Sequence, residues 1–416
     1  MPDSSLLNLH SSLRKVKHRW AIFLGAGSSY DFGIPTMAEM ASVLMKVVEG
    51  GKPEHCLTQP TIDLLKTLCP ASNDTAHSWN VEDLLTRLHQ IIEATKAPTQ
   101  SFIPLSASIG GAAIDAHIVC KASDELVMFM CNMCELGGQK RASHGSGKIN
   151  YISDFFLTLG AMGTDIRVFT TNIDLCVEAA LVQLSQRPQA NRRPDMVLID
   201  GFESALVPTF GFDCYRRESK SFGDRIPVYL WKLHGSIDWT YSRPAPPSVP
   251  NEISDGLAQA GFSDQSIIVR RVDGELWKQL YDSGALHSPL PEDSPRRVVF
   301  PTPAKYSQTY TYPYINLYES FRRTLQDIEL LICVGTSFPD QHIRSAIRSF
   351  VERDNTLLFV ADPKMGDEAL AKLFGKATTI QPVIQKGFED FVSEFMALES
   401  GLVTKNTQAK ASEAGK

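Results

Sequence analysis

Five short apolar runs, each ending abruptly in glycine or polar residues, constrain the fold of this sequence most strongly. They occupy Trp20–Leu24, Ile166–Thr170, Val228–Leu233, Glu329–Val334 and Thr356–Ala361, and a sixth lies at Arg297–Phe300. Runs of this length are typical of strands buried on both faces. Amphipathic helical patterns alternate with them, at Leu175–Leu184, Gln341–Glu352 and Asp367–Phe374. This alternation predicts an α/β fold, with a Rossmann-like parallel sheet covered by helices on both faces.

Two long segments interrupt the alternation. Residues 37–160 are predicted to form a large, mostly helical insertion, with helical periodicity at Met37–Val48, Asn80–Ala94, Glu125–Cys134 and Tyr151–Leu159. Residues 242–296 are rich in Pro, Ser and Gly without a clear period, which predicts a surface insertion. The Rossmann domain then consists of residues 1–36 and 161–400, and the polar tail at 401–416 is expected to be disordered.

Composition limits the classes of partner. The net charge of −6 gives no general attraction to nucleic acid, although direct binding through a local basic patch stays open. The N-terminus lacks an apolar core of signal-peptide length, and no run approaches a membrane span. The eight cysteines are scattered, several in apolar runs, as expected of reduced, buried thiols. We therefore expect a cytoplasmic protein without membrane association.

The residues at the strand ends predict a dinucleotide site. In a parallel α/β sheet, ligands bind where the loops converge at the carboxyl ends of the strands. A pyrophosphate needs backbone N–H groups that approach closely and hydroxyl donors, and an acidic side chain suits ribose hydroxyls. The predicted binding residues are Gly25, Ala26, Gly27, Ser28, Ser29, Thr171, Asp174, Gly335, Thr336, Ser337 and Asp362.

These residues also have purely structural interpretations. A Gly-x-Gly turn after a strand is more often a tight turn than a nucleotide loop. Ser28, Ser29 and Asn172 are residue types that cap helices, and Asp174 fits a helix N-terminus electrostatically. A lone histidine such as His234 is more often a satisfied core residue. The occurrence of five such signals in strand order favours a shared ligand site.

Four of the motifs give the chain a resemblance to the sirtuin family. Gly25-Ala26-Gly27-Ser28 resembles the family's nucleotide loop, and Thr171-Asn172-Ile173-Asp174 is similar to its Asn–Ile–Asp motif. Leu233-His234-Gly235 resembles its catalytic His–Gly motif, and Gly335-Thr336-Ser337 its later loop. The resemblance covers Trp20–Thr36 and Ile166–Phe391, and it implies that the chain binds NAD as a substrate.

The chain also departs from the lysine deacylases of that family. Those proteins carry two Cys-x-x-Cys pairs after the catalytic histidine, which bind a structural zinc ion. Here only Cys333 follows His234, and the single pair, Cys131 and Cys134, precedes it within a helical pattern. We therefore expect no zinc or other metal. The Pro-Asp-Phe-Arg continuation of the glycine loop is replaced by Ile34–Met37, which argues against peptide binding.

The zinc-less pattern resembles bacterial sirtuin-like proteins of antiphage defence. The resemblance implies NAD hydrolysis and, for one group, a hexameric HerA-type ATPase as partner. An enzyme that depletes NAD is toxic to its host, so we expect it to be gated and to act as a homo-oligomer. The two insertions are expected to serve assembly or gating rather than chemistry.

We interpret Asn172 and His234 as the catalytic residues of an NAD glycohydrolase. The nicotinamide ring is already cationic while it is attached in NAD, so no general acid has to protonate it before it leaves. Asn172 would position a water and the ribose hydroxyls, and His234 would act as general base or bind those hydroxyls. Three alternatives stay open: an NAD or ADP-ribose sensor regulating a partner ATPase, a lysine deacylase, and a nucleic-acid-processing protein, against which the acidic charge argues.

Overall fold

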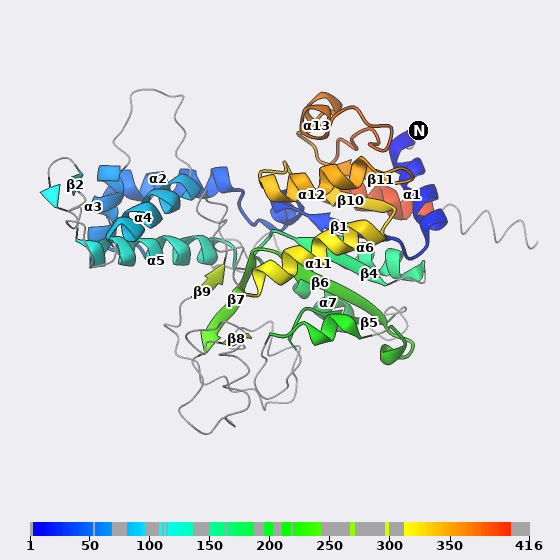
Figure 1. Ribbon diagram of the computed structural model, residues 1–416, viewed down its shortest axis with the longest axis horizontal. Helices are drawn as coiled ribbons and strands as arrows, with labels where there is room; N and C mark the ends of the chain where they lie inside the picture. The colour runs from blue at the N-terminus through cyan, green and yellow to red at the C-terminus, as the bar shows by residue number, and fades with distance from the viewer. Residues whose placement is uncertain are drawn as a thin grey trace, which may run out of the picture.

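The computed structural model has a six-stranded parallel sheet at its centre (Figure 1). Its strands are β1 (Trp20–Leu24), β4 (Ile166–Thr170), β5 (Met196–Ile199), β6 (Ile226–Lys232), β10 (Leu330–Val334) and β11 (Leu357–Ala361). They lie in the order β11-β10-β1-β4-β6-β5, and each neighbouring pair is parallel. The structure describes residues 3–52, 55–68, 81–95, 108–109, 112–113, 115–135, 150–162, 165–186, 195–202, 210–217, 219–242, 267–270, 296–298 and 312–400.

The parallel sheet predicted from the five apolar runs is confirmed, and these five strands are consecutive in it. β1 and β10 are buried along their whole length, which is why their sequences show no polar alternation. The edge strand β5 is not apparent from the sequence. It has only four residues, three of them half-buried, which is too short for a recognisable period.

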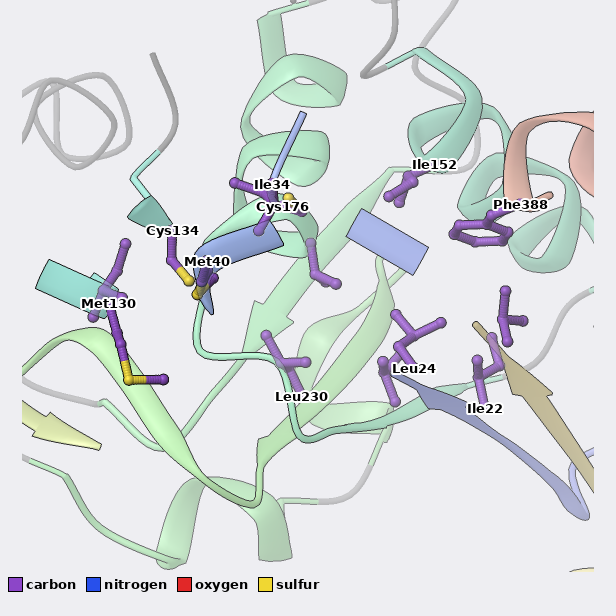
Figure 2. Packing of buried hydrophobic residues seen from close by; sticks show 14 of the residues in the cluster. Ile22, Leu24, Ile34, Met40, Met130, Cys134, Ile152, Cys176, Leu230 and Phe388 are labelled. Atoms are coloured by element: carbon purple, nitrogen blue, oxygen red, sulfur yellow. The ribbon is translucent and has the colours of Figure 1, made fainter. Parts of the chain in front are cut away.

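Helices cover both faces of the sheet, as predicted. One face carries α11 (Tyr314–Asp327), α12 (Gln341–Val351) and α13 (Asp367–Phe374), and the other carries α1 (Ser4–Val16), α6 (Asn150–Ala161), α7 (Cys176–Gln186) and a helix over 388–400. The side chains of β1 alternate between the two cores. Phe23 belongs to the first core, whereas Ile22 and Leu24 belong to the second, where Figure 2 shows them with Ile152 and Phe388.

Four helices form a separate layer to one side of the sheet (Figure 1). They are α2 (Met37–Gly50), α3 (Gln59–Leu68), α4 (Val81–Thr95) and α5 (Ala116–Met133). The short β2 (Ser108–Ile109) and β3 (Ala112–Ala113) come between α4 and α5 in the sequence. α2 begins with a capping box, in which Thr36 and Glu39 satisfy each other's backbone N–H groups. Figure 2 shows Met40, Met130 and Cys134 of this layer in the core.

The last helix of the predicted insertion belongs elsewhere. α6 packs against α7 and β4, which are elements of the parallel-sheet domain. α2, α3, α4 and α5 instead pack mainly against one another. We therefore propose that the helical insertion ends before α6 rather than at residue 160. The remaining domain boundaries stay predictions.

A second, three-stranded sheet is formed at and within the predicted surface insertion: β8 lies inside residues 242–296, and β7 and β9 lie at its two ends. β7 (Gly235–Ser242) lies between β8 (Ile267–Arg270) and β9 (Arg296–Val298), and both pairings are antiparallel. The apolar run at Arg297–Phe300 was expected in the parallel sheet, and this expectation is wrong. An apolar run predicts a strand but does not specify its partner, and here β9 pairs with β7. Residues 243–266, 271–295 and the tail at 401–416 lie outside the described residues.

Hydropathy of the helices bears on membrane association. Among the helices that the structure describes, none is both long and apolar enough to cross a membrane.

Candidate functional site

The predicted site residues follow strands that are neighbours in the sheet. β1, β4, β6, β10 and β11 are parallel, so their carboxyl ends share one edge. β1 occupies the centre, with β10 on one side and β4 on the other. Chain connections from β1 and β10 leave in opposite directions along the sheet, and a crevice for ligands forms at such a point. The strand order therefore brings the loops of all five motifs to one edge.

The glycine loops after β1 and β10 pack directly on each other. Gly27 N donates to Gly335 O at 2.8 Å, and Gly25 N donates to Val334 O at 2.9 Å. Gly335 has φ +62°, and a Cβ there would lie 2.3 Å from Ser28 N. A Cβ on Gly25 would lie 2.6 Å from Gly335 O. These glycines are thus required for contact between the two loops, which form one wall of the site.

Asn172 is the hydrogen-bonding centre of this wall. Its Nδ2 donates to Gly25 O at 2.9 Å, to Ser29 Oγ at 2.9 Å and to Ser28 Oγ at 3.3 Å. A carbonyl oxygen accepts only, so the Gly25 contact fixes which end of the amide is nitrogen. The backbone N–H of Asn172 donates to Thr170 Oγ1 at 2.9 Å. The amide oxygen Oδ1 is thereby directed away from the glycine loop.

Three hydroxyl-bearing residues of the glycine loops, Ser28, Ser29 and Thr336, are buried. Ser28 and Ser29 are 1% and 2% exposed, and Ser28 Oγ donates to Gly25 O at 2.8 Å. Thr336 is buried, and its Oγ1 accepts from Phe338 N at 3.1 Å. Ala26 is exposed at the same edge. The hydroxyls of Ser28, Ser29 and Thr336, which were predicted to contact a pyrophosphate, are therefore engaged in holding Asn172 and the loops.

The other predicted binding residues are spread along the edge. Thr171 is half-buried, with its N–H 3.4 Å from Leu24 O, and Ser337 is exposed. Asp362 directly follows β11, two strands from β1, and its Oδ1 accepts from the N–H groups of Lys364 and Met365. The geometry of Asp362 is that of a turn-forming carboxylate.

Behind Asn172 lies a buried cluster of charged residues. Asp174 Oδ1 accepts from Cys176 N at 3.0 Å and caps α7, and Lys232 donates to the Asp174 carbonyl. Lys232 Nζ also lies 2.9 Å from Glu178 Oε1, and these two side chains are 4% and 2% exposed. Burial, opposed by the Lys232 ammonium, raises the pKa of Glu178 to about 7. Burial lowers the pKa of Lys232, but the carboxylates of Glu178, Asp238 and Asp174 together outweigh it and raise the pKa above its usual value.

His234 lies in the turn between β6 and β7. Leu233 N still donates to Thr170 O at 2.8 Å, and Gly235, with φ +76°, begins β7. The histidine is 3% exposed, and its Nε2 lies 3.5 Å from Asp340 Oδ2 at the start of α12. Asp340 was missed by sequence reasoning. An aspartate at the start of a helix is ordinarily interpreted as an N-cap, and no neighbouring residue in the sequence indicates that this one lies close to His234.

Two cavities among the described residues bear on the position of the site. A small cavity of about 10 Å³ lies among Asn172, Ser29, Cys176 and Lys232, about enough for one water. A wider groove of about 1090 Å³ runs between α11 and α12, and none of the predicted site residues lines it. We place the candidate site at the strand ends because the glycine loops, Asn172 and His234 lie there and not in the groove.

The structure bears on two chemical possibilities, a cysteine nucleophile and a bound metal ion. Burial raises the pKa of the Cys176 thiol well above its usual value, so a thiolate nucleophile beside Asn172 is disfavoured. Within the ranges that the structure describes, no three His, Cys, Asp or Glu side chains are grouped to hold a metal ion. Cys131 and Cys134 are buried on α5. The expectation of a zinc-free protein stays a prediction.

Comparison with known proteins gives a family. Residues 166–383, just over half of the chain, match the model of the SIR2-like domain. No curated protein matches the sequence. The range includes the loops of Asn172, His234 and Gly335, whereas β1 and its glycine loop precede it.

Solved structures that resemble the chain include the following Sir2 proteins. A Sir2 homologue in complex with NAD is 11% identical, with a TM-score of 0.44, over 95% of this chain and 94% of that one. A structure on the mechanism and regulation of Sir2 enzymes is 13% identical, with a TM-score of 0.39, over 95% and 98%. A Sir2 protein bound to an acetylated peptide is 11% identical, with a TM-score of 0.39, over 95% and 98%. On the strength of the sequence match, the chain belongs to the SIR2-like domain family.

Proposed function

We propose that the protein cleaves the nicotinamide–ribose bond of NAD with water, giving nicotinamide and ADP-ribose. One observation carries the proposal: Asn172 and His234 follow adjacent strands at the same level. Thr170 of β4 pairs with Lys232 of β6, and each catalytic candidate comes two residues after its member of that pair. An amide and an imidazole side by side at the strand ends suit a reaction that needs a positioned water and a base.

The reaction needs few groups beyond a positioned water and a base. The bond breaks through an oxocarbenium-like state, and the neutral nicotinamide leaves with the bonding electrons. The amide oxygen of Asn172 accepts a hydrogen bond from the attacking water, because its nitrogen is held by Gly25 and Ser29. His234 takes the proton that the water loses, and the water oxygen forms the new bond to the ribose carbon. Protein groups supply every step, without a metal.

The rest of NAD would lie along the glycine loops. The pyrophosphate would take the exposed surface at Ala26 and Ser337, because the neighbouring hydroxyls face inward. The adenosine ribose would lie toward Asp362, at the end of β11. This placement changes the roles first expected of Ser28, Ser29 and Thr336, which support the wall instead of contacting phosphate.

The biological setting is proposed from the sequence resemblance. We infer a gated enzyme that depletes NAD in antiphage defence, acting as a homo-oligomer in the cytoplasm with a HerA-type ATPase as a candidate partner. Burial of His234 at 3% exposure supports gating, because NAD reaches the imidazole only after its surroundings move.

One assay tests the reaction. The purified chain, alone and with its partner ATPase, is incubated with NAD, and products are separated by chromatography. His234→Ala and Asn172→Ala should each reduce nicotinamide release by roughly 10²- to 10⁴-fold with NAD binding retained. His18→Ala, at an exposed histidine outside the site, should have no effect.

Two results would overturn the proposal. Release of nicotinamide at the parent rate by both site variants would exclude these residues from the chemistry. Measurable NAD binding by the parent protein without any product, in every assembly tested, would make the chain a sensor.

A further inference from the structure

The Asp340 carboxylate faces the His234 imidazole from the loop after β10. We infer that Asp340 is a positioning residue that holds His234 with the proton on Nε2 and the lone pair on Nδ1. This inference rests on the proposed NAD cleavage for its catalytic meaning. The two residues come from distant parts of the chain, and Nε2 and Oδ2 are 3.5 Å apart. Such contacts are often long in a free enzyme and shorten when substrate binds.

The N-terminus of α12 supports a specific role for the contact between Asp340 and His234. Asp340 occupies the N-cap position of α12, but its side chain makes no capping hydrogen bond. A capping aspartate stabilises a helix, and Asp340 does not make this contribution. Its carboxylate is instead 3% exposed, beside an imidazole that is equally buried. A buried carboxylate is costly unless a donor faces it, and the Nε2–H of His234 is such a donor.

The loop that carries Asp340 is held in an unusual conformation. Gly335 and Phe338 have φ +62° and +55°, and for a phenylalanine this region is strained. Phe338 is buried, and its ring packs edge-on against Phe374 at 5.0 Å. Thr336 Oγ1 accepts from the Phe338 backbone. Packing therefore maintains a strained path that ends with Asp340 beside His234.

The pairing determines which nitrogen can act as the base. In a neutral imidazole, the nitrogen that donates to a carboxylate keeps the proton, and the other nitrogen carries the lone pair. When water attacks the ribose carbon, Nδ1 would accept its proton and the ring would become an imidazolium. The Asp340 carboxylate then faces a full positive charge at a short distance, which stabilises the charge that develops during the reaction.

The first test does not depend on activity. Nitrogen NMR of protein labelled at histidine reports the tautomer of each ring, and the His234 signal is assigned by its loss in His234→Gln. We expect the Nε2–H tautomer in the parent protein and a mixture of tautomers in Asp340→Ala. The Nδ1–H tautomer in the parent, or an unchanged tautomer in Asp340→Ala, would overturn the inference, whether or not the protein cleaves NAD.

The second test asks whether Asp340 acts through His234. Asp340→Asn should lower kcat by roughly 10- to 100-fold, the range seen for carboxylates that orient a functional histidine, with little change in KM. In the His234→Ala background the same substitution should have no further effect. A second loss of similar size in that background would indicate a structural role and overturn the inference.

A matched control separates helix capping from positioning. Asp115 is also an N-cap aspartate, and its Oδ1 does accept a hydrogen bond, from His117 N. Asp115→Asn should leave kcat and the His234 tautomer unchanged. If the parent enzyme releases no nicotinamide in any assembly, the proposed reaction fails, and the NMR result still decides the pairing.

Discussion

The candidate site has two halves that are built from different interactions. In the neutral half, formed by the loops after β1, β4 and β10, Asn172 is held by neutral hydrogen bonds to Gly25, Ser28 and Ser29, with glycine backbones in direct contact. In the charged half, formed by the buried residues of β6, its following turn and their partners, the contacts join charged or titratable groups, as between His234 and Asp340. We infer that the neutral half fixes the geometry of the site and the charged half transfers and stabilises protons.

The strongest test of this comparison removes the positive charge of Lys232 from the buried cluster next to Asn172. Lys232→Met leaves Glu178 buried without its cation, and we expect a loss of roughly 3–5 kcal/mol in the free energy of unfolding, measured in urea. The double variant Lys232→Met/Glu178→Leu should recover most of it. Lys386→Met, which breaks the partly exposed pair with Glu394, should lose far less. Equal losses in both single variants would remove the contrast.

The second test crowds the neutral half. Gly335→Ala adds a Cβ 2.3 Å from Ser28 N at φ +62°, and we expect a loss of roughly 2–5 kcal/mol, since backbone strain and overpacking act together. Gly223→Ala provides the control, because φ is +64° with open space around the added carbon. Its loss should be about 1 kcal/mol. Similar losses at both glycines would mean that the loop contact has no energetic role.

A third prediction concerns pH. The pKa of Glu178 is raised in the folded state to about 7, so folding takes up a proton between roughly pH 4.5 and 7. The stability contributed by this group is fully present below its unfolded pKa and is lost as pH rises through 7. Relative to Lys232→Met/Glu178→Leu, the parent should therefore lose stability over this window, by at most about 1.4 kcal/mol per pH unit. A flat difference would contradict the assignment.

The smallest expected effect comes from a single hydroxyl. Ser29→Ala removes one acceptor of Asn172 and should destabilise the protein by about 1 kcal/mol. Because it loosens Asn172, nicotinamide release should fall by roughly tenfold while the His234 tautomer stays unchanged. Ser345→Ala, on the exposed side of α12, should change neither. A shifted tautomer in Ser29→Ala would show that the two halves are not independent.

Much of the fold was predictable because its signals are local. The five apolar runs identified five strands, and the helices after β4, β10 and β11 followed from their periodicity. The short edge strand β5 and the pairing of β9 with β7 were not predictable in this way. Three or four residues give too little pattern, and an apolar run carries no information about which partner it will bond.

The candidate site was predicted in part. Asn172 and His234 were singled out because each directly follows an apolar strand, and the pairing of β4 with β6 makes these strand ends neighbours. Their catalytic roles stay predictions. The inward hydroxyls of Ser28 and Ser29 were not anticipated. Side-chain direction in a loop depends on what packs against it, here Asn172 from another strand, and no nearby residue in the sequence records that contact.

The sequence by itself determined which residues end the strands, since a buried strand and the glycine turn that stops it are both local features. Only the tertiary structure decided which of those ends meet. Gly335 lies against Gly27, and Asp340 faces His234, because β10 inserts next to β1 in the sheet. That neighbourhood depends on the packing of the whole chain, in which segments far apart in sequence are brought to one edge.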